Sequence, residues 1–180
     1  MELEILHWIQ NLHTDWLDPI MIFVTTLGEG GIIWCALALV LLFFPKTRRC
    51  GKLMVGVMMF SFLLGNLILK NIIARDRPFT VDTTVSLLIK EPGEYSFPSG
   101  HTLNGFSAAT MLFLHYRGPG IAAFVLAGII AFSRMYLFVH YPTDILGGLI
   151  LGVVDALVIY LVAARRFPVE NKAGQTAGQG

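Results

Sequence analysis

The sequence is short of charged residues and of cysteine, and it has no basic segment at its N-terminus. Asp, Glu, Lys and Arg make up 14% of the 180 residues, whereas soluble domains carry about 25%. Cys35 lies in an apolar run and Cys50 in a basic loop, so no disulfide between them is expected. A formal net charge of +1 gives no support for a nucleic-acid partner. Because Glu2 and Glu4 stand where a cleavable signal would carry basic residues, no such signal is predicted.

Apolar residues dominate instead, since they form 55% of the chain and occur in long runs. A helix that crosses a bilayer needs about 20 mainly apolar residues. The runs predict an all-α fold, a polytopic membrane helix bundle with about six transmembrane helices in one domain, residues 1–166. The segments expected in the membrane are residues 20–27, 32–44, 53–73, 102–116, 121–138 and 143–164. The polar residues 167–180 are expected to form a flexible cytoplasmic tail.

Two parts of this pattern are less regular. Residues 3–12 carry apolar side chains at helical spacing, which predicts a short amphipathic helix at the membrane interface. The first two apolar segments are separated by Gly-Glu-Gly-Gly at residues 28–31, and the first of them is too short to span alone. Two short helices joined by a turn and one broken helix both fit this pattern.

The basic residues predict an orientation in the membrane. With six segments, both termini would lie on one side, together with the basic loop 45–52, Arg117, Arg165 and Arg166. The positive-inside rule makes this side the cytoplasmic face of the plasma (inner) membrane. Residues 96–102 would then lie on the outer side.

Residues 96–102, Ser-Phe-Pro-Ser-Gly-His-Thr, form a polar stretch at the start of the fourth segment. The free N–H groups at a helix start bind anions. Gly100 would let an oxyanion approach the backbone, Ser99 can donate a hydroxyl hydrogen bond, and His101 can give or take a proton. A serine cap followed by an interfacial histidine explains the same residues.

Three cations and a His–Asp pair are expected near the same side of the membrane. Lys70, Arg77 and Arg134 lie close to segment ends, where each alone is explained by contact with lipid headgroups. His140 and Asp144 are four residues apart, so the carboxylate can hold one ring nitrogen and leave the other free as a nucleophile. Such a pair alone is more often structural. Together with the predicted anion site, however, these groups suit phosphoryl transfer.

The same residues carry a family resemblance. They form three motifs, Lys70-x6-Arg77-Pro78, Pro98-Ser99-Gly100-His101 and Ser133-Arg134-x5-His140-x3-Asp144. In this order they resemble the three-part signature of the type 2 phosphatidic acid phosphatase superfamily, over about residues 53–164. The resemblance implies a six-helix membrane bundle, hydrolysis without a metal or other cofactor, and a phosphohistidine intermediate.

The resemblance also implies a role for each matching residue. His140 would be the nucleophile, Asp144 would orient it, and His101 would protonate the leaving group. The phosphate oxygens would be held by Lys70, Arg77 and Arg134, with the Ser99 hydroxyl and the Gly100 N–H. The carboxylates in the loop between the third and fourth segments have no recognisable metal-ligand spacing, so no metal site is predicted there.

A site near the outer interface suits a membrane lipid phosphate whose chains stay in the bilayer. We expect a bacterial phosphatase for undecaprenyl pyrophosphate, phosphatidylglycerophosphate or phosphatidic acid. Three alternatives stay open: a phosphotransferase with an acceptor other than water, a vanadate-dependent haloperoxidase, and a non-catalytic lipid-binding protein. The oligomeric state also stays open. Asp155, within the last segment, is expected to make an interhelical hydrogen bond rather than to bind substrate or carry protons.

Overall fold

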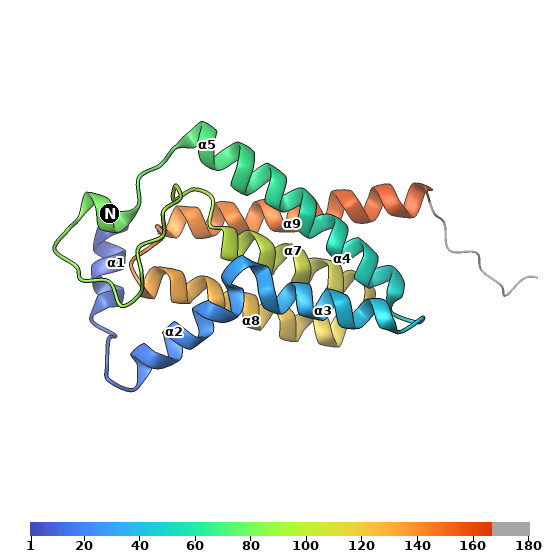
Figure 1. Cartoon of the computed structure of the whole chain (residues 1–180), viewed down its shortest axis with the longest axis horizontal. Coiled ribbons are helices and arrows are strands. Elements are labelled where there is room, and N and C mark those ends of the chain that lie inside the picture. Colours follow the sequence, from blue (N-terminus) through green and yellow to red (C-terminus); the bar gives the residue numbers. More distant parts are fainter. Residues whose placement is uncertain (167–180) are drawn as a thin grey trace, which may run out of the picture.

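The computed structural model describes residues 1–166, and every regular element in this range is a helix (Figure 1). The elements are α1 (Glu2–Gln10), α2 (Leu17–Gly28), the 3-10 turn η1 (Glu29–Gly31), α3 (Ile32–Phe43), α4 (Arg48–Ser61), the π-helix η2 (Phe62–Leu69), α5 (Lys70–Ile73), α6 (Pro78–Val81), α7 (Gly100–His115), α8 (Arg117–Tyr136) and α9 (Pro142–Arg166). The predicted all-α fold class is confirmed. The predicted tail, residues 167–180, lies outside the described residues.

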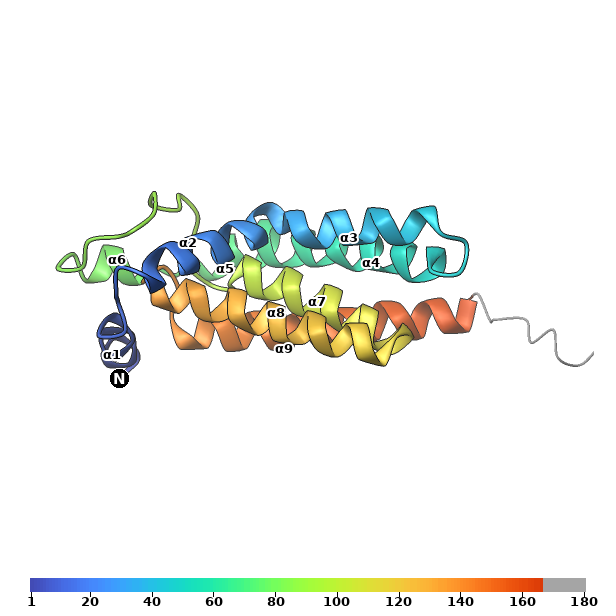
Figure 2. The same cartoon turned by 90° about the horizontal axis from the view of Figure 1, so that it is seen from below.

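Helix α7 lies at the centre of a bundle of long helices. Figure 2 shows α2 to α5 on one side of α7, and α8 and α9 on the other. Contacts with α4, α8 and α9 bury nearly every side chain between Thr102 and Leu112. A helix that is buried on all faces forms the core of its bundle. The polar stretch of residues 96–102 at the start of α7 therefore lies at the centre of one end of the bundle.

Four segments have the length and composition of a membrane span: Leu17–Phe43, Arg48–Val81, Arg117–Tyr136 and Pro142–Arg166. With α7, which has 16 residues and is shorter than these spans, the chain passes along the bundle five times. The expectation of about six transmembrane helices is not confirmed, because the first two apolar segments form a single span. The protein is nevertheless a membrane protein by the length and hydropathy of these helices.

The break in the first span is a turn of three residues, Glu29–Gly31. Gly30 and Gly31 have φ angles of 58° and 71°, which glycine adopts without a steric penalty. Beyond this turn α3 continues along the bundle (Figure 1). Of the two arrangements that fit the sequence, the structure therefore has the single broken helix.

The second span also contains an irregular segment, the π-helix Phe62–Leu69 between α4 and α5. Wider π turns interrupt α-helices frequently at functional sites. Here the π segment ends directly before Lys70, the first residue of α5, whose side chain is buried. The π segment therefore determines the direction in which the Lys70 side chain extends from the helix.

Helix α1 packs against the bundle through one face. Leu6 and Ile9 are buried against the residues that join α8 to α9, while Trp8 on another face is 65% exposed. Figure 1 shows α1 at the same end of the bundle as α6, whereas α9 ends at the opposite end. The basic loop after α3 lies at that far end, since Tyr116 Oη donates to the Lys46 carbonyl at 3.0 Å.

This arrangement differs from the expected positions of the two chain ends in the bundle. The N-terminal helix was expected on the side of the basic loop and of Arg166, away from the site. Instead, Glu2 lies at the other end of the bundle, 2.6 Å from Arg75. The physical reason is that five passes along the bundle, unlike six, place the two ends of the described chain on opposite sides.

Candidate active site

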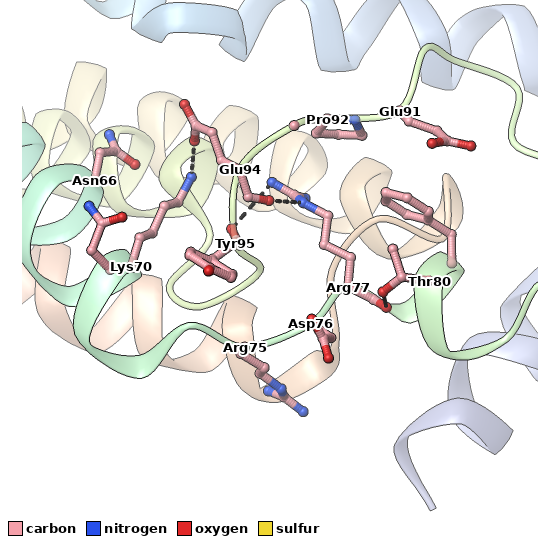
Figure 3. Close-up of a pocket in the computed structure, with 13 residues that line it drawn as sticks. Asn66, Lys70, Arg75, Asp76, Arg77, Thr80, Glu91, Pro92, Glu94 and Tyr95 are labelled. Carbon is pink, nitrogen blue, oxygen red and sulfur yellow. Dashed lines mark hydrogen bonds and ion pairs between the residues drawn. The ribbon is translucent and has the colours of Figure 1, made fainter.

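A cavity of about 740 Å3 lies among η1, η2, the start of α7 and the end of α8. It brings together side chains from distant parts of the chain, because the long helices end side by side here. Predicted site residues that line it are Lys70, Arg77, Gly100, His101, Arg134 and His140. A second cavity of about 450 Å3 adjoins it and shares Lys70 and Arg77 (Figure 3). The predicted cations and histidines therefore converge on one hollow.

Lys70 and Arg77 form one wall of this hollow, and both are 5% exposed. Lys70 makes an ion pair with Glu94. Arg77 donates from Nε to the Glu94 carbonyl at 2.6 Å and from Nη1 to the Val139 carbonyl at 2.8 Å. Figure 3 shows both cations directed at the loop around Glu94. These bonds hold two positive charges beside the cavity.

Glu94 is a site residue that the sequence did not reveal. The Lys70 ammonium group holds the pKa of the Glu94 carboxyl below its ordinary value, mainly through their hydrogen bond. The Glu94 side chain is 68% exposed, so solvent weakens this pair. Its carboxylate occupies a position beside Lys70 that an anionic substrate oxygen could take. Among the loop carboxylates, no sequence signal distinguishes Glu94 from Glu91.

Arg134 and His101 lie on the opposite wall. Arg134 Nη1 donates to Thr25 Oγ1 at 2.5 Å, while Arg134 Nε and His101 Nε2 are buried without a hydrogen-bond partner in the described structure. Asn104 Oδ1 is a third buried atom without a partner. Buried polar groups are normally paired. Three such atoms around one cavity mark a place for a polar ligand.

His140 lies in the connection between α8 and α9 and is 2% exposed. Its Nε2 is 3.3 Å from Arg77 Nη1, and its Nδ1 is 3.5 Å from Asp144 Oδ2. The second distance exceeds that of an ordinary hydrogen bond. Burial lowers the pKa of His140 to about 3. The imidazole is thus neutral and has Nε2 directed at the cavity wall formed by Arg77.

Asp144 lies behind His140, within the first turn of α9, and is fully buried. Oδ2 accepts from Ser96 Oγ at 2.5 Å and from the Tyr141 N–H at 2.9 Å. Oδ1 accepts from Arg75 Nη1 at 2.6 Å. Ser96 and Arg75 were not predicted, although Ser96 belongs to the polar stretch and Arg75 precedes Arg77 by two residues.

Ser99 and Gly100 were predicted to bind phosphate at the start of α7. Gly100 lines the cavity, and a Cβ atom there would lie 2.9 Å from Asn66 Oδ1. Ser99 is fully buried, and its hydroxyl accepts a hydrogen bond from Thr102 Oγ1 at 3.0 Å. The structure therefore brings Gly100 to the cavity, whereas Ser99 is not among the residues that line it. The Ser99 contact with phosphate stays a prediction.

The charges of this site suit an anion. Four cations and two histidines line the cavity, against the three carboxylates of Glu29, Glu91 and Glu94. The described residues 1–166 hold no group of three or more His, Cys, Asp or Glu placed to bind a metal ion. Positive side chains fixed by neighbouring bonds stabilise the charge that develops on transferring phosphoryl oxygens. An imidazole such as that of His140 is one of the groups that can act as a nucleophile.

Comparisons with known proteins agree with this chemistry. The PAP2 superfamily model matches residues 51–168. Undecaprenyl-diphosphatase of Sulfolobus acidocaldarius is 32% identical over 76% of this chain and 66% of that protein. Phosphatidylglycerophosphatase B of Bacillus subtilis is 34% identical over 84% of this chain and 76% of that protein. The crystal structure of Aquifex aeolicus LpxE matches 89% of this chain and 94% of that chain, with a TM-score of 0.78 and 26% identity. The chain therefore belongs to the PAP2 superfamily.

Proposed function

We propose that this chain hydrolyses a phosphorylated membrane lipid, without a metal ion, through a phosphohistidine at His140. The observation that carries the proposal is the 3.3 Å approach of Arg77 Nη1 to His140 Nε2. The guanidinium group donates to Nε2, which is therefore the unprotonated ring nitrogen. When a phosphate oxygen takes over this donor, it is held next to the attacking atom. Lys70 and Arg134 line the same cavity and supply the remaining positive charge.

In the first step, His140 Nε2 forms a bond to phosphorus while the bond from phosphorus to the leaving oxygen breaks. His101, which lines the cavity with His140, gives its proton to that oxygen. The charge of the bound phosphate offsets the three cations and favours the protonated form of His101. Asp144, 3.5 Å from Nδ1, stabilises the positive imidazole ring that forms.

In the second step, a water molecule attacks phosphorus and the bond from Nε2 to phosphorus breaks. His101 takes a proton from that water, so it returns to its starting state and orthophosphate leaves. A sugar or alcohol in place of water would make the protein a phosphotransferase. The two outcomes differ in their products, because only hydrolysis releases one orthophosphate for each lipid consumed.

The substrate class follows from the position of the cavity. It lies at one end of the bundle, where the polar residues around Lys70 and Arg77 meet the lipid-facing side chain of Phe62. A phosphate at headgroup depth can enter while its lipid chains stay in the bilayer. The names of the relatives favour undecaprenyl pyrophosphate and phosphatidylglycerophosphate, and phosphatidic acid belongs to the same chemical class.

The basic residues support an outward-facing site in the cell membrane. Loop 45–52, Arg117 and Arg166 lie at the end opposite to the cavity. The positive-inside rule places that end in the cytoplasm. With five passes, α1 and the cavity then lie on the outer side, and residues 1–166 form one domain.

The test is orthophosphate release by detergent-purified protein from these three lipids, with EDTA present. We expect release from at least one lipid, its loss in His140→Ala, and a large decrease in Asp144→Asn. His115→Ala is the matched control, because His115 lies at the other end of α7. Full activity of His140→Ala would refute the nucleophile, and loss of activity with EDTA would refute metal independence. Lipid turnover without orthophosphate would indicate a transferase.

A further inference from the structure

Arg75 lines the smaller cavity but not the cavity of His140, and Figure 3 shows its guanidinium group pointing away from Lys70 and Arg77. It extends instead behind the His140–Asp144 pair. Arg75 Nη1 donates to Asp144 Oδ1 at 2.6 Å and to Thr143 Oγ1 at 2.7 Å. Its guanidinium also lies 4.0 Å from the centre of the Tyr141 ring. Arg75 therefore contacts three of the four residues that follow His140, namely residues 141, 143 and 144.

Arg75 is in turn held by the first residue of α1. Its Nη2 donates to Glu2 Oε2 at 2.6 Å. The other oxygen of Glu2 accepts from the Thr143 N–H at 3.1 Å and from Thr143 Oγ1 at 2.6 Å. The Glu2 carboxylate thus caps the N-terminus of α9, where a negative charge is stabilised. Glu2, Arg75 and Asp144 form a continuous row of alternating charges.

The row of charged side chains ends beside His140, the proposed nucleophile. Oδ2 of Asp144 contacts Ser96, the Tyr141 N–H and His140. The hydrogen bond from Arg75 to Oδ1 fixes the rotation of the carboxylate group. A carboxylate that is fully buried needs such charge-assisted partners to stay ionised in place. Rotation of the Asp144 side chain would move Oδ2 away from the imidazole.

We propose that Arg75 is a positioning residue that orients Asp144 toward His140, and that Glu2 of the interfacial helix α1 holds Arg75 in this position. The inference rests on the proposed role of His140 as nucleophile. It gives α1 a function beyond packing, because the helix contributes a charge to the support of the catalytic pair. Neither Arg75 nor Glu2 lines the cavity of His140.

The first experiment compares Arg75→Gln and Glu2→Gln with the parent protein in the lipid phosphatase assay. Loss of a charge-assisted hydrogen bond to Asp144 should lower kcat by about 10- to 100-fold. KM should stay near the parent value, because the phosphate contacts are untouched. His7→Gln is the matched control, since it removes the contact of α1 with Asp82 at 2.7 Å without touching Asp144. A parent-like kcat for Arg75→Gln would overturn the proposal.

A double-mutant comparison separates positioning from general destabilisation. If Arg75 acts through Asp144, adding Arg75→Gln to Asp144→Asn should lower kcat little further. Full additivity of the two losses would overturn the proposal. A merely structural arginine would also resist chemical rescue, whereas we expect added methylguanidinium to restore part of the kcat of Arg75→Ala.

Ligand binding gives a readout that does not depend on lipid turnover. Orthovanadate accepts a fifth ligand and so depends on an oriented nucleophile, whereas orthophosphate depends on the cations alone. Titration calorimetry should show that Arg75→Gln weakens vanadate about 10-fold and leaves phosphate binding unchanged. Equal effects on both anions would overturn the inference. If Arg75→Gln weakens vanadate binding as expected but the parent protein hydrolyses no lipid phosphate, only the proposed function is refuted.

Discussion

Ser61 donates a hydrogen bond of 2.7 Å to Asp155 Oδ2, which joins the last residue of α4 to the middle of α9. Both side chains are buried, at 0% and 3% exposure. The interhelical hydrogen bond predicted for Asp155 is therefore confirmed. A polar pair inside a membrane bundle contributes to helix association because neither group finds water there.

Ser61→Ala should lower the free energy of unfolding by about 1 kcal/mol, because Asp155 loses its partner in an apolar environment. Asp155→Asn keeps a group that can accept the bond and should cost less. Unfolding in mixed detergent measures both, with phosphatase activity followed in parallel. If Asp155→Asn abolished turnover at unchanged stability, Asp155 would have a chemical role instead.

Gly152 allows the backbone of α9 to pack directly against the backbone of α7. A Cβ atom there would lie 2.6 Å from the Leu103 carbonyl oxygen and 2.9 Å from the Ser107 backbone nitrogen. Because neither backbone atom can move without shifting α7, Gly152→Ala should destabilise the protein by about 1–3 kcal/mol. Gly128→Ala is the control, since a Cβ atom there meets nothing within 4 Å. That variant should be neutral or more stable by up to about 1 kcal/mol, and equal losses in both would contradict the packing argument.

Glu94 should compete with phosphate for Lys70. The ion pair must break before Lys70 can contact a substrate oxygen, so Glu94→Gln should strengthen inhibition by orthophosphate by roughly twofold to fivefold, the range for an exposed pair. Glu91→Gln is the matched control, because it removes the same charge from the same loop and keeps the Lys70 contact. Steady-state inhibition by orthophosphate measures both constants. Equal changes in the two variants would show that only the overall charge matters.

His140 should make stability depend on pH. Burial lowers its pKa to about 3, whereas a histidine in the unfolded chain titrates near 6.5. Below about pH 6.5 the unfolded chain binds a proton that the folded protein does not, so stability is present above this pH and falls as the pH decreases, by up to about 1.4 kcal/mol per unit. Melting temperatures between about pH 7 and pH 5 should fall more steeply for the parent than for His140→Gln. Parallel curves would contradict the neutral, buried state of His140.

The site residues differ in how visible they are in the sequence. Lys70, Arg77, Arg134 and His140 stand out because a charged or titratable side chain at the edge of an apolar run needs a reason. Arg75 has the same charge and position, yet only the tertiary structure shows that its side chain bonds to Asp144 and does not line the cavity of His140. The phosphate role of Ser99 was predicted from the helix start and stays a prediction, because its buried hydroxyl accepts from Thr102 and can still donate.

By itself, the sequence determined the membrane environment, the helical class and the set of groups for phosphoryl transfer. Long apolar runs allow only structures that satisfy their backbone hydrogen bonds internally, and a helix does so within one segment. The tertiary structure decided that α2 and α3 form one span, that α1 lies beside the site, and that Glu2 reaches Arg75. These features depend on how separate segments pack, and local periodicity does not encode contacts between residues as far apart as Glu2 and Asp144.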